Sequence, residues 1–184
     1  MDAISAFVPD EGTALEIASG TGQHVVRYAE AFPNIVWQPT DIDTDRLKSI
    51  AIWTLDSDLS NIQKPELLNA TSDSWSPTWL GQNLIILSNL LHLISEREAM
   101  NVITQSAKAL ASGGVSLIYG PFLRGADFAS EGDQKFHESL QFKDSEIGYK
   151  SYQFVQNAQT DSGLIPLEPI PMPSSNLLLV ARKP

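Results

Sequence analysis

The chain has 184 residues, of which 42% are apolar and 18% charged, and its formal net charge is −10. This length and composition favour one globular domain over 1–184, and the acidic balance argues against a nucleic-acid partner, which requires a basic face. The sequence has no cysteine, which excludes disulfide bonds, thiolate metal sites and a cysteine nucleophile. No apolar run reaches the roughly 18–20 residues of a membrane span and no secretory signal is visible, so no membrane partner and a cytoplasmic location are expected.

The first half of the chain alternates strand and helix patterns, with strands expected over 13–18, 35–40 and 66–70 and helices over 23–32 and 45–54. Pro33 ends the first helix because proline cannot continue its hydrogen-bond ladder. Asp43 or Thr44 is expected to cap the second helix. The strand over 66–70 is predicted to be short and buried, within an otherwise polar and irregular stretch.

The second half continues the alternation, with strands expected over 84–88 and 115–120, helices over 95–110, 130–142 and 151–161, and two final apolar runs over 164–172 and 177–182. Ser95 and Glu98 form a capping box for the first of these helices, and Gly113 and Gly114 are expected to end it. The two final runs are joined too closely for a helical crossover, so they should pair antiparallel. The whole pattern predicts an α/β fold, a doubly wound and mostly parallel sheet with an antiparallel C-terminal strand.

The turn after the first strand, LEIASGTG over 15–22, carries the strongest functional signal. Gly20 and Gly22 can adopt a positive φ and let the backbone approach a ligand closely, and the helix that follows directs free N–H groups toward it. A dinucleotide fingerprint, G-x-G-x-x-G, would need a third glycine where Val25 stands, so that fingerprint is broken. The spacing Glu-x-x-x-Gly-x-Gly, which begins at Glu16, resembles motif I of class I S-adenosylmethionine (SAM) methyltransferases.

Further candidate residues follow the other strands, at the edge where a doubly wound sheet binds its ligands. Asp41 follows the second strand, about 20 residues after the glycines, where a carboxylate can accept ribose hydroxyls, and Asp43 is its rival. Asn69 follows the third strand, where adenine is usually recognised. Ser88 and Asn89 follow the fourth strand and are expected beside the reactive methyl group. A sulfonium cation suits such an acidic, carbonyl-rich pocket better than a pyrophosphate does.

Candidates for catalysis are few. His92 is the histidine best placed for proton transfer, because the ordinary pKa of histidine lies near neutrality, although a packed histidine at the start of the next helix is the alternative. His24 is expected beside the cofactor, in the first turn of its helix. Tyr119 and Asn176 are candidates for lining a substrate cavity. The three histidines have no metal-ligand spacing, so no metal site is predicted.

Six segments in a fixed order resemble a methyltransferase-like family of unassigned substrate, over about 13–183. They are LEIASGTGQH, WQPTD, the Ile50–Trp53 pair before Leu59-Ser60-Asn61-Ile62, Asn89-x-x-His92, Tyr119-Gly120-Pro121-Phe122 and Met172-Pro173-x-x-Asn176-Leu177. The resemblance implies the Rossmann-like class I methyltransferase fold and SAM as cofactor. The residues expected to hold SAM are Glu16, Ala18, Gly20, Thr21, Gly22, His24, Asp41, Asn69, Ser88 and Asn89. Family members usually begin with a segment that covers the cofactor site, and this sequence starts after that segment.

The leading functional hypothesis is direct in-line methyl transfer from SAM to a small-molecule acceptor, a reaction that depends on positioning more than on a strong base. A non-catalytic SAM-binding protein that acts in interaction or sensing is the first alternative. An NAD-dependent oxidoreductase is the second, and Val25 at the third glycine position argues against it. The sequence gives neither the acceptor nor the oligomeric state.

Overall fold

The computed structural model describes residues 2–184, and within them eight strands form one sheet. The strands are β1 (Gly12–Ile17), β2 (Ile35–Asp41), β3 (Glu66–Leu67), β4 (Gln82–Ser88), β5 (Leu110–Gly120), β6 (Ile165–Pro166), β7 (Ile170–Pro171) and β8 (Leu177–Arg182). The helices are α1 (Asp2–Ser5), α2 (Gln23–Ala31), α3 (Thr44–Ser57), α4 (Glu96–Ala109), α5 (Glu131–Lys143) and α6 (Tyr152–Asp161), with 3₁₀ turns at Ser76–Trp79, Leu91–Leu93 and Pro173–Ser175.

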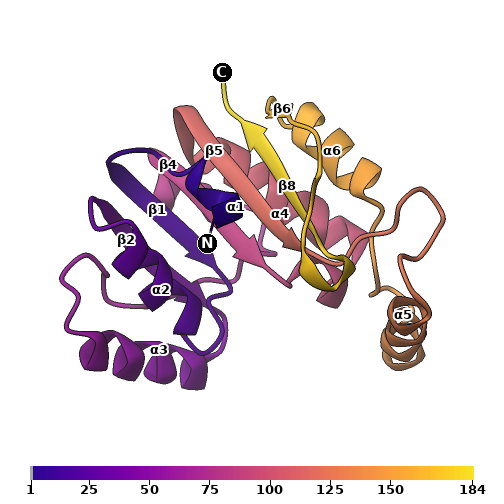
Figure 1. Ribbon diagram of the computed structural model, residues 1–184, viewed down its shortest axis with the longest axis horizontal. Coiled ribbons are helices and arrows are strands. Elements are labelled where there is room, and N and C mark those ends of the chain that lie inside the picture. Colours follow the sequence, from indigo (N-terminus) through magenta and orange to yellow (C-terminus); the bar gives the residue numbers. More distant parts are fainter. Residues whose placement is uncertain (1) are drawn as a thin grey trace.

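The strand order is β3-β2-β1-β4-β5-β8-β6, with β7 also paired to β8 (Figure 1). The five strands from β3 to β5 run parallel, and β8 runs antiparallel to β5. Both β6 and β7 pair antiparallel with β8, as predicted for the two final apolar runs. The expected doubly wound α/β fold with an antiparallel C-terminal strand is therefore confirmed.

Helices cover both faces of the sheet (Figure 1). On one face, α4 and α6 complete a buried cluster that includes Val102 and Leu15. On the other face, α2 and α3 complete a second cluster that includes Ile50 and Ala14. Successive residues of a strand point to opposite faces, so Glu16, two residues after Ala14, points to the face covered by α2.

The helix starts follow the predicted caps. The Ser95 hydroxyl accepts a hydrogen bond from the Glu98 amide while the Glu98 carboxylate accepts one from the Ser95 amide, which is the expected capping box. The Asp43 carboxylate accepts a hydrogen bond from the Asp45 amide at 2.8 Å, so Asp43 rather than Thr44 caps α3. Local side-chain chemistry therefore fixes where these helices begin.

Two predictions about the elements are wrong. The strand expected over 66–70 has only two residues, Glu66 and Leu67, and both are exposed, because it lies at the edge of the sheet beside β2 alone. The helix α4 ends at Ala109 and not at the glycine pair. The Gly81 amide donates to the Ala109 carbonyl at 2.9 Å, and the Lys183 ammonium donates to carbonyls in the last turn of α4. These partners, distant in sequence, satisfy carbonyl groups at the C-terminal end of α4, and the glycine pair lies inside β5.

None of the helices in residues 2–184 is long and apolar enough to cross a lipid bilayer.

Gly22 is where the packing of α2 on α3 can be tested. A Cβ at this position would lie 2.8 Å from the Ile50 Cα, and the backbone φ is +92°. We expect Gly22→Ala to lower the free energy of unfolding by about 2–4 kcal/mol, from the clash and the left-handed backbone together. Urea denaturation measures this loss.

Gly163→Ala is the matched control. Gly163 also has a positive φ, +83°, but a Cβ there would meet nothing within 4 Å. In Gly163→Ala the free energy of unfolding should fall by only about 1 kcal/mol, the cost of the left-handed backbone alone. Equal losses in the two variants would show that the close approach of Ile50 does not constrain position 22.

Candidate functional site

The turn that follows β1 alternates left-handed residues. Ala18, Gly20 and Gly22 have φ values of 54°, 61° and 92°. A left-handed alanine costs about 1–2 kcal/mol relative to the right-handed form, so the surroundings must impose the conformation at Ala18. The sequence marks Gly20 and Gly22 by their residue type, but nothing in it shows that Ala18 takes the same conformation.

Hydrogen bonds fasten this turn to the end of β2. The Ser19 amide donates to the Thr40 carbonyl at 2.8 Å, and the Thr40 amide donates to the Ser19 hydroxyl at 3.1 Å. The Thr40 hydroxyl donates to the Glu16 carbonyl at 2.8 Å. Ser19 and Thr40 are both buried. Sequence reasoning missed these two residues, because a serine and a threonine at strand ends carry no distinctive spacing.

Asp41 completes this fastening. Its Oδ2 accepts a hydrogen bond from the Gly20 amide at 2.9 Å, and its Oδ1 accepts one from the Asp43 amide at 3.0 Å. Arg46 lies 3.7 Å from Oδ2. The side chain of Asp41 is 1% exposed and does not line the cleft described next. In this structure the carboxylate holds the turn, and the predicted contact with ribose has no support from its position.

A cleft of about 320 Å³ opens at the carboxyl ends of β1 and β4. It is lined by Glu16, Ala18, Ser19, Gly20, Thr21, Gln23, His24, Arg46, Ser88, Asn89, Leu90 and Leu93. The structure therefore brings together seven of the predicted cofactor residues, namely Glu16, Ala18, Gly20, Thr21, His24, Ser88 and Asn89. Gly22 is not among the lining residues, since its bare Cα faces Ile50. At Gly20, by contrast, a Cβ would meet nothing within 4 Å.

A second compartment of about 390 Å³ adjoins the cleft and shares His24, Ser88 and Asn89 with it. Its other lining residues are Ile4, Arg27, Tyr28, Ile86, Tyr119, Met172, Pro173 and Leu178. The Asn176 amide donates a hydrogen bond to the Tyr119 hydroxyl at 2.8 Å. The two residues predicted for a substrate cavity are thus paired, and Tyr119 lines the compartment.

Glu16 gives the cleft its electrostatic character. The side chain is 3% exposed, and its Oε2 has no hydrogen-bond partner. Burial raises the pKa of the Glu16 carboxyl to about 8, the hydrogen bond with Ser19 opposes this shift, and the Asp41 charge adds to it. A buried carboxyl with a free oxygen at the edge of a cleft is an acceptor for a cation or an N–H group of a ligand.

The structure does not bring Asn69 to the cleft. Its side chain is exposed, and its Oδ1 accepts hydrogen bonds from the Thr71 amide at 3.1 Å and the Thr71 hydroxyl at 2.8 Å. This local turn uses the amide that was predicted to recognise adenine, and Asn69 lines neither compartment.

Like Asn69, His92 does not line either compartment. Its buried ring lies edge-on to the rings of Phe136 and Tyr149, with centroids 5.8 and 5.9 Å away. Burial and, to a lesser extent, the nearby Lys150 charge together lower the pKa of His92 to about 4. Such a weak base accepts few protons at neutral pH, so the geometry favours the alternative of a packed histidine. The histidine that the structure places where the two compartments meet is His24.

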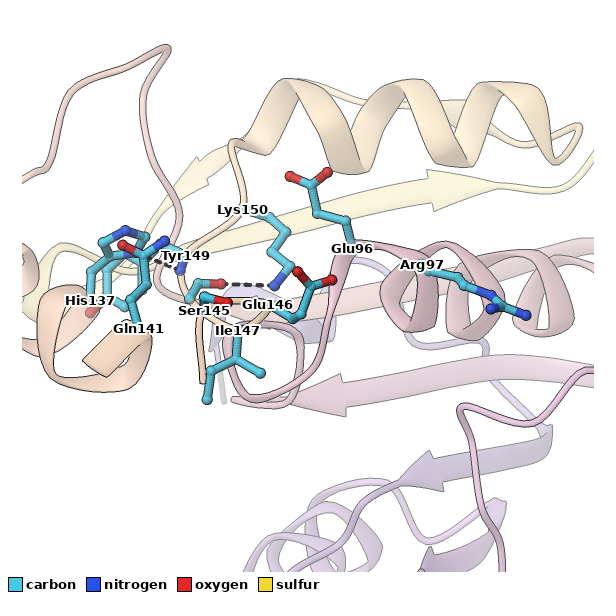
Figure 2. Close-up of a pocket in the computed structure, with 10 residues that line it drawn as sticks. Glu96, Arg97, His137, Gln141, Ser145, Glu146, Ile147, Tyr149 and Lys150 are labelled. Atoms are coloured by element: carbon cyan, nitrogen blue, oxygen red, sulfur yellow. Dashed lines mark hydrogen bonds between the residues drawn. The ribbon is translucent and has the colours of Figure 1, made fainter. Parts of the chain in front are cut away.

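A separate pocket of about 240 Å³ surrounds Lys150 and shares no lining residue with the cleft (Figure 2). The Lys150 ammonium is buried and donates to the carbonyls of Ile94 and Gly148. Burial lowers the pKa of Lys150, while the charges of Glu96 and Glu98 oppose that shift. This lysine fastens the segment before α6 to the start of α4. Across residues 2–184, no group of three His, Cys, Asp or Glu side chains is arranged to hold a metal ion.

Comparison with known families gives a match over nearly the whole chain. A family model described as "Protein of unknown function (DUF938)" matches residues 1–183.

Several solved structures share the fold. They include an O-methyltransferase family 2 protein from Planctomyces limnophilus in complex with apigenin (18% identity, TM-score 0.79, 94% of this chain and 51% of that one). An O-methyltransferase family protein from Burkholderia thailandensis is similar (18% identity, TM-score 0.80, 93% of this chain and 50% of that one). The structure described as PigF with SAH is similar too (17% identity, TM-score 0.79, 93% of this chain and 50% of that one). The chain spans about half the length of these proteins. At such identities the likeness establishes the fold.

The raised pKa of Glu16 makes stability depend on pH in a specific direction. Between the ordinary value of 4.5 and about 8, the folded protein binds a proton at Glu16 that the unfolded chain releases. Wild-type stability therefore falls as pH rises through this window. Glu16→Gln removes this contribution, so its stability relative to wild type should improve by roughly 3 kcal/mol between pH 5 and pH 8.

Urea denaturation of both proteins at the two pH values measures the change. Glu66→Gln is the control, because Glu66 is an exposed glutamate at the edge of the sheet. A stability difference between Glu16→Gln and wild type that stays constant across this window would contradict the burial of an ionisable Glu16.

Proposed function

The chain belongs to the family described as "Protein of unknown function (DUF938)", and we propose that it is a methyltransferase that binds SAM in the cleft between β1 and β4. The observation that carries this proposal is the buried, unpartnered Oε2 of Glu16 at the wall of a cleft formed by a left-handed glycine turn. A cation bound beside this buried carboxyl lowers its raised pKa and pairs with the carboxylate that forms, so the position favours a cationic ligand. The solved O-methyltransferases of the same fold add support, since one of them is described with SAH.

The residues of the cleft fit this cofactor. Glu16 offers a free acceptor for the ammonium of its methionine part, and Gly20 leaves backbone open where a Cβ would project into empty space. Ser88 and Asn89 supply polar groups at the end of β4. When bound, SAM supplies a methyl group on a positively charged sulfur, which a nucleophile can take. A pyrophosphate is an anion and gains no such pairing from Glu16, so the cleft favours SAM over NAD.

The second compartment would then hold the methyl acceptor. It meets the cleft at Ser88 and Asn89, so a bound acceptor can approach the cofactor there. Orientation of the two reactants supplies most of the rate in such a transfer. His24 lies at the same junction and can take the proton that the acceptor loses. This role replaces the one predicted for His92.

Titration calorimetry tests the cofactor assignment. We expect SAM and S-adenosylhomocysteine to bind and NAD not to bind. Gly20→Val places a branched side chain in the cleft and should weaken S-adenosylhomocysteine binding by at least about tenfold, or about 1.4 kcal/mol. Binding of NAD without SAM would overturn the proposal.

Gly163→Val is the control for this variant. Gly163 has a similar positive φ and open space around its Cα, but it lies after α6 and lines neither compartment. It should keep the wild-type affinity for S-adenosylhomocysteine. If Gly20→Val also kept that affinity while folded, the cofactor site would have to lie elsewhere.

A further inference from the structure

The compartment beside the cleft has a charge pattern that the rest of the chain does not share. The sequence contains 22 Asp and Glu residues against 12 Lys and Arg. Among the side chains that the structure describes, no acidic one lines this compartment, and Arg27 is the one formally charged side chain that does. The cleft next to it is lined by Glu16 and contains no cation except Arg46, which is paired with Asp41 and Asp43.

Arg27 is available to a ligand. Its side chain is exposed, and the ion pairs found across residues 2–184 join Arg46 and Lys48 to aspartates but do not include Arg27. A guanidinium presents a planar set of donors that matches a carboxylate. It lies three residues after His24, so both side chains point from the same side of α2, one turn apart.

The walls around Arg27 are mainly apolar. Ile86 of β4 and Leu178 of β8 form part of the sheet surface, Ile4 comes from α1, and Met172 and Pro173 come from the segment before β8. At about 390 Å³ the compartment is near the lower end of the range for small-molecule sites. Its shape and lining therefore suit a small ligand with an apolar body.

Polar groups in the compartment are mostly hydrogen-bond donors. The Tyr119 hydroxyl accepts a bond from Asn176, which leaves its own proton to donate. Burial raises the pKa of Tyr28 to about 12, so its phenol stays protonated at neutral pH. The Glu16 carboxyl acts on the Tyr28 phenol, but it lines the cleft and not this compartment, and its raised pKa of about 8 keeps it mostly protonated at neutral pH. The two phenols and the guanidinium can therefore donate to an anion in this compartment.

We propose that this compartment binds the methyl acceptor, and that the acceptor is a small organic acid whose apolar body lies against Ile86 and Leu178 and whose carboxylate pairs with Arg27. The assignment as acceptor rests on the proposed function. The nucleophile lies where the compartment meets the cleft, at His24, Ser88 and Asn89, and the carboxylate lies at Arg27, about one helical turn after His24 along α2.

Matched acids and amides test this directly. The probes are benzoate, phenylacetate and 2-naphthoate, each with its neutral amide, titrated by NMR against protein saturated with S-adenosylhomocysteine. We expect at least one acid to bind roughly fivefold more tightly than its amide, the difference typical of one accessible ion pair. Arg27→Met keeps the apolar stem and should abolish this preference while leaving the affinity for S-adenosylhomocysteine unchanged.

Arg97→Met is the matched control, since Arg97 is an exposed arginine of α4 that lines neither compartment. It should keep the preference for the acid. The proposal is overturned if no acid is preferred over its amide, if Arg97→Met acts as Arg27→Met does, or if Arg27→Met weakens S-adenosylhomocysteine binding, because Arg27 would then hold the cofactor.

The same titrations without S-adenosylhomocysteine separate the two proposals. A preference for the acid that depends on Arg27 supports the anion site even when the cofactor does not bind. Failure of S-adenosylhomocysteine to bind would overturn only the proposed function and the assignment of the bound acid as acceptor.

Discussion

The hydrogen bonds between the β1 turn and the end of β2 are the constraint on which the candidate site depends. Ser19 and Thr40 exchange two of them, and the Gly20 amide donates to Asp41. They hold the turn in an alternating left-handed path that includes Ala18, a residue that does not favour it. The cost of that conformation is offset by bonds that are buried. Because Asp41 is used in this way, Glu16 is left as the carboxyl with an acceptor free for a ligand.

The arrangement also divides the site by charge. Glu16 lines the cleft, while Arg27 lines the compartment beside it, and Ser88 and Asn89 lie between them. A cationic cofactor would favour release of the Glu16 proton and pair with the carboxylate, while an anionic acceptor would pair with Arg27. This separation orders two reactants without a strong base. The central role of the cleft therefore comes from the Oε2 of Glu16, a buried side-chain atom at its wall that lacks a protein partner.

Much of the fold could be predicted because local patterns and tertiary structure agree, as at the capping box of Ser95. The end of α4 could not, because Lys183, more than 70 residues later in the sequence, supplies donors there. In the site, the glycine turn was visible from residue types. The burial of His92 and the hydrogen bond from the Gly20 amide to Asp41 depend on tertiary contacts, which residue spacing does not encode. Spacing along the chain located the edge of the sheet, but it did not show which side chains there face the ligand.

The central claim is that the cleft between β1 and β4 is the cofactor site. A crystal structure of the protein grown with S-adenosylhomocysteine tests it most directly. The account predicts ligand density along the Gly20 turn, with the amino group of the ligand near the Oε2 of Glu16 and its sulfur near Ser88 and Asn89. Ligand density in the pocket around Lys150 would contradict it. A cleft that holds no ligand at a saturating concentration of S-adenosylhomocysteine would contradict it as well.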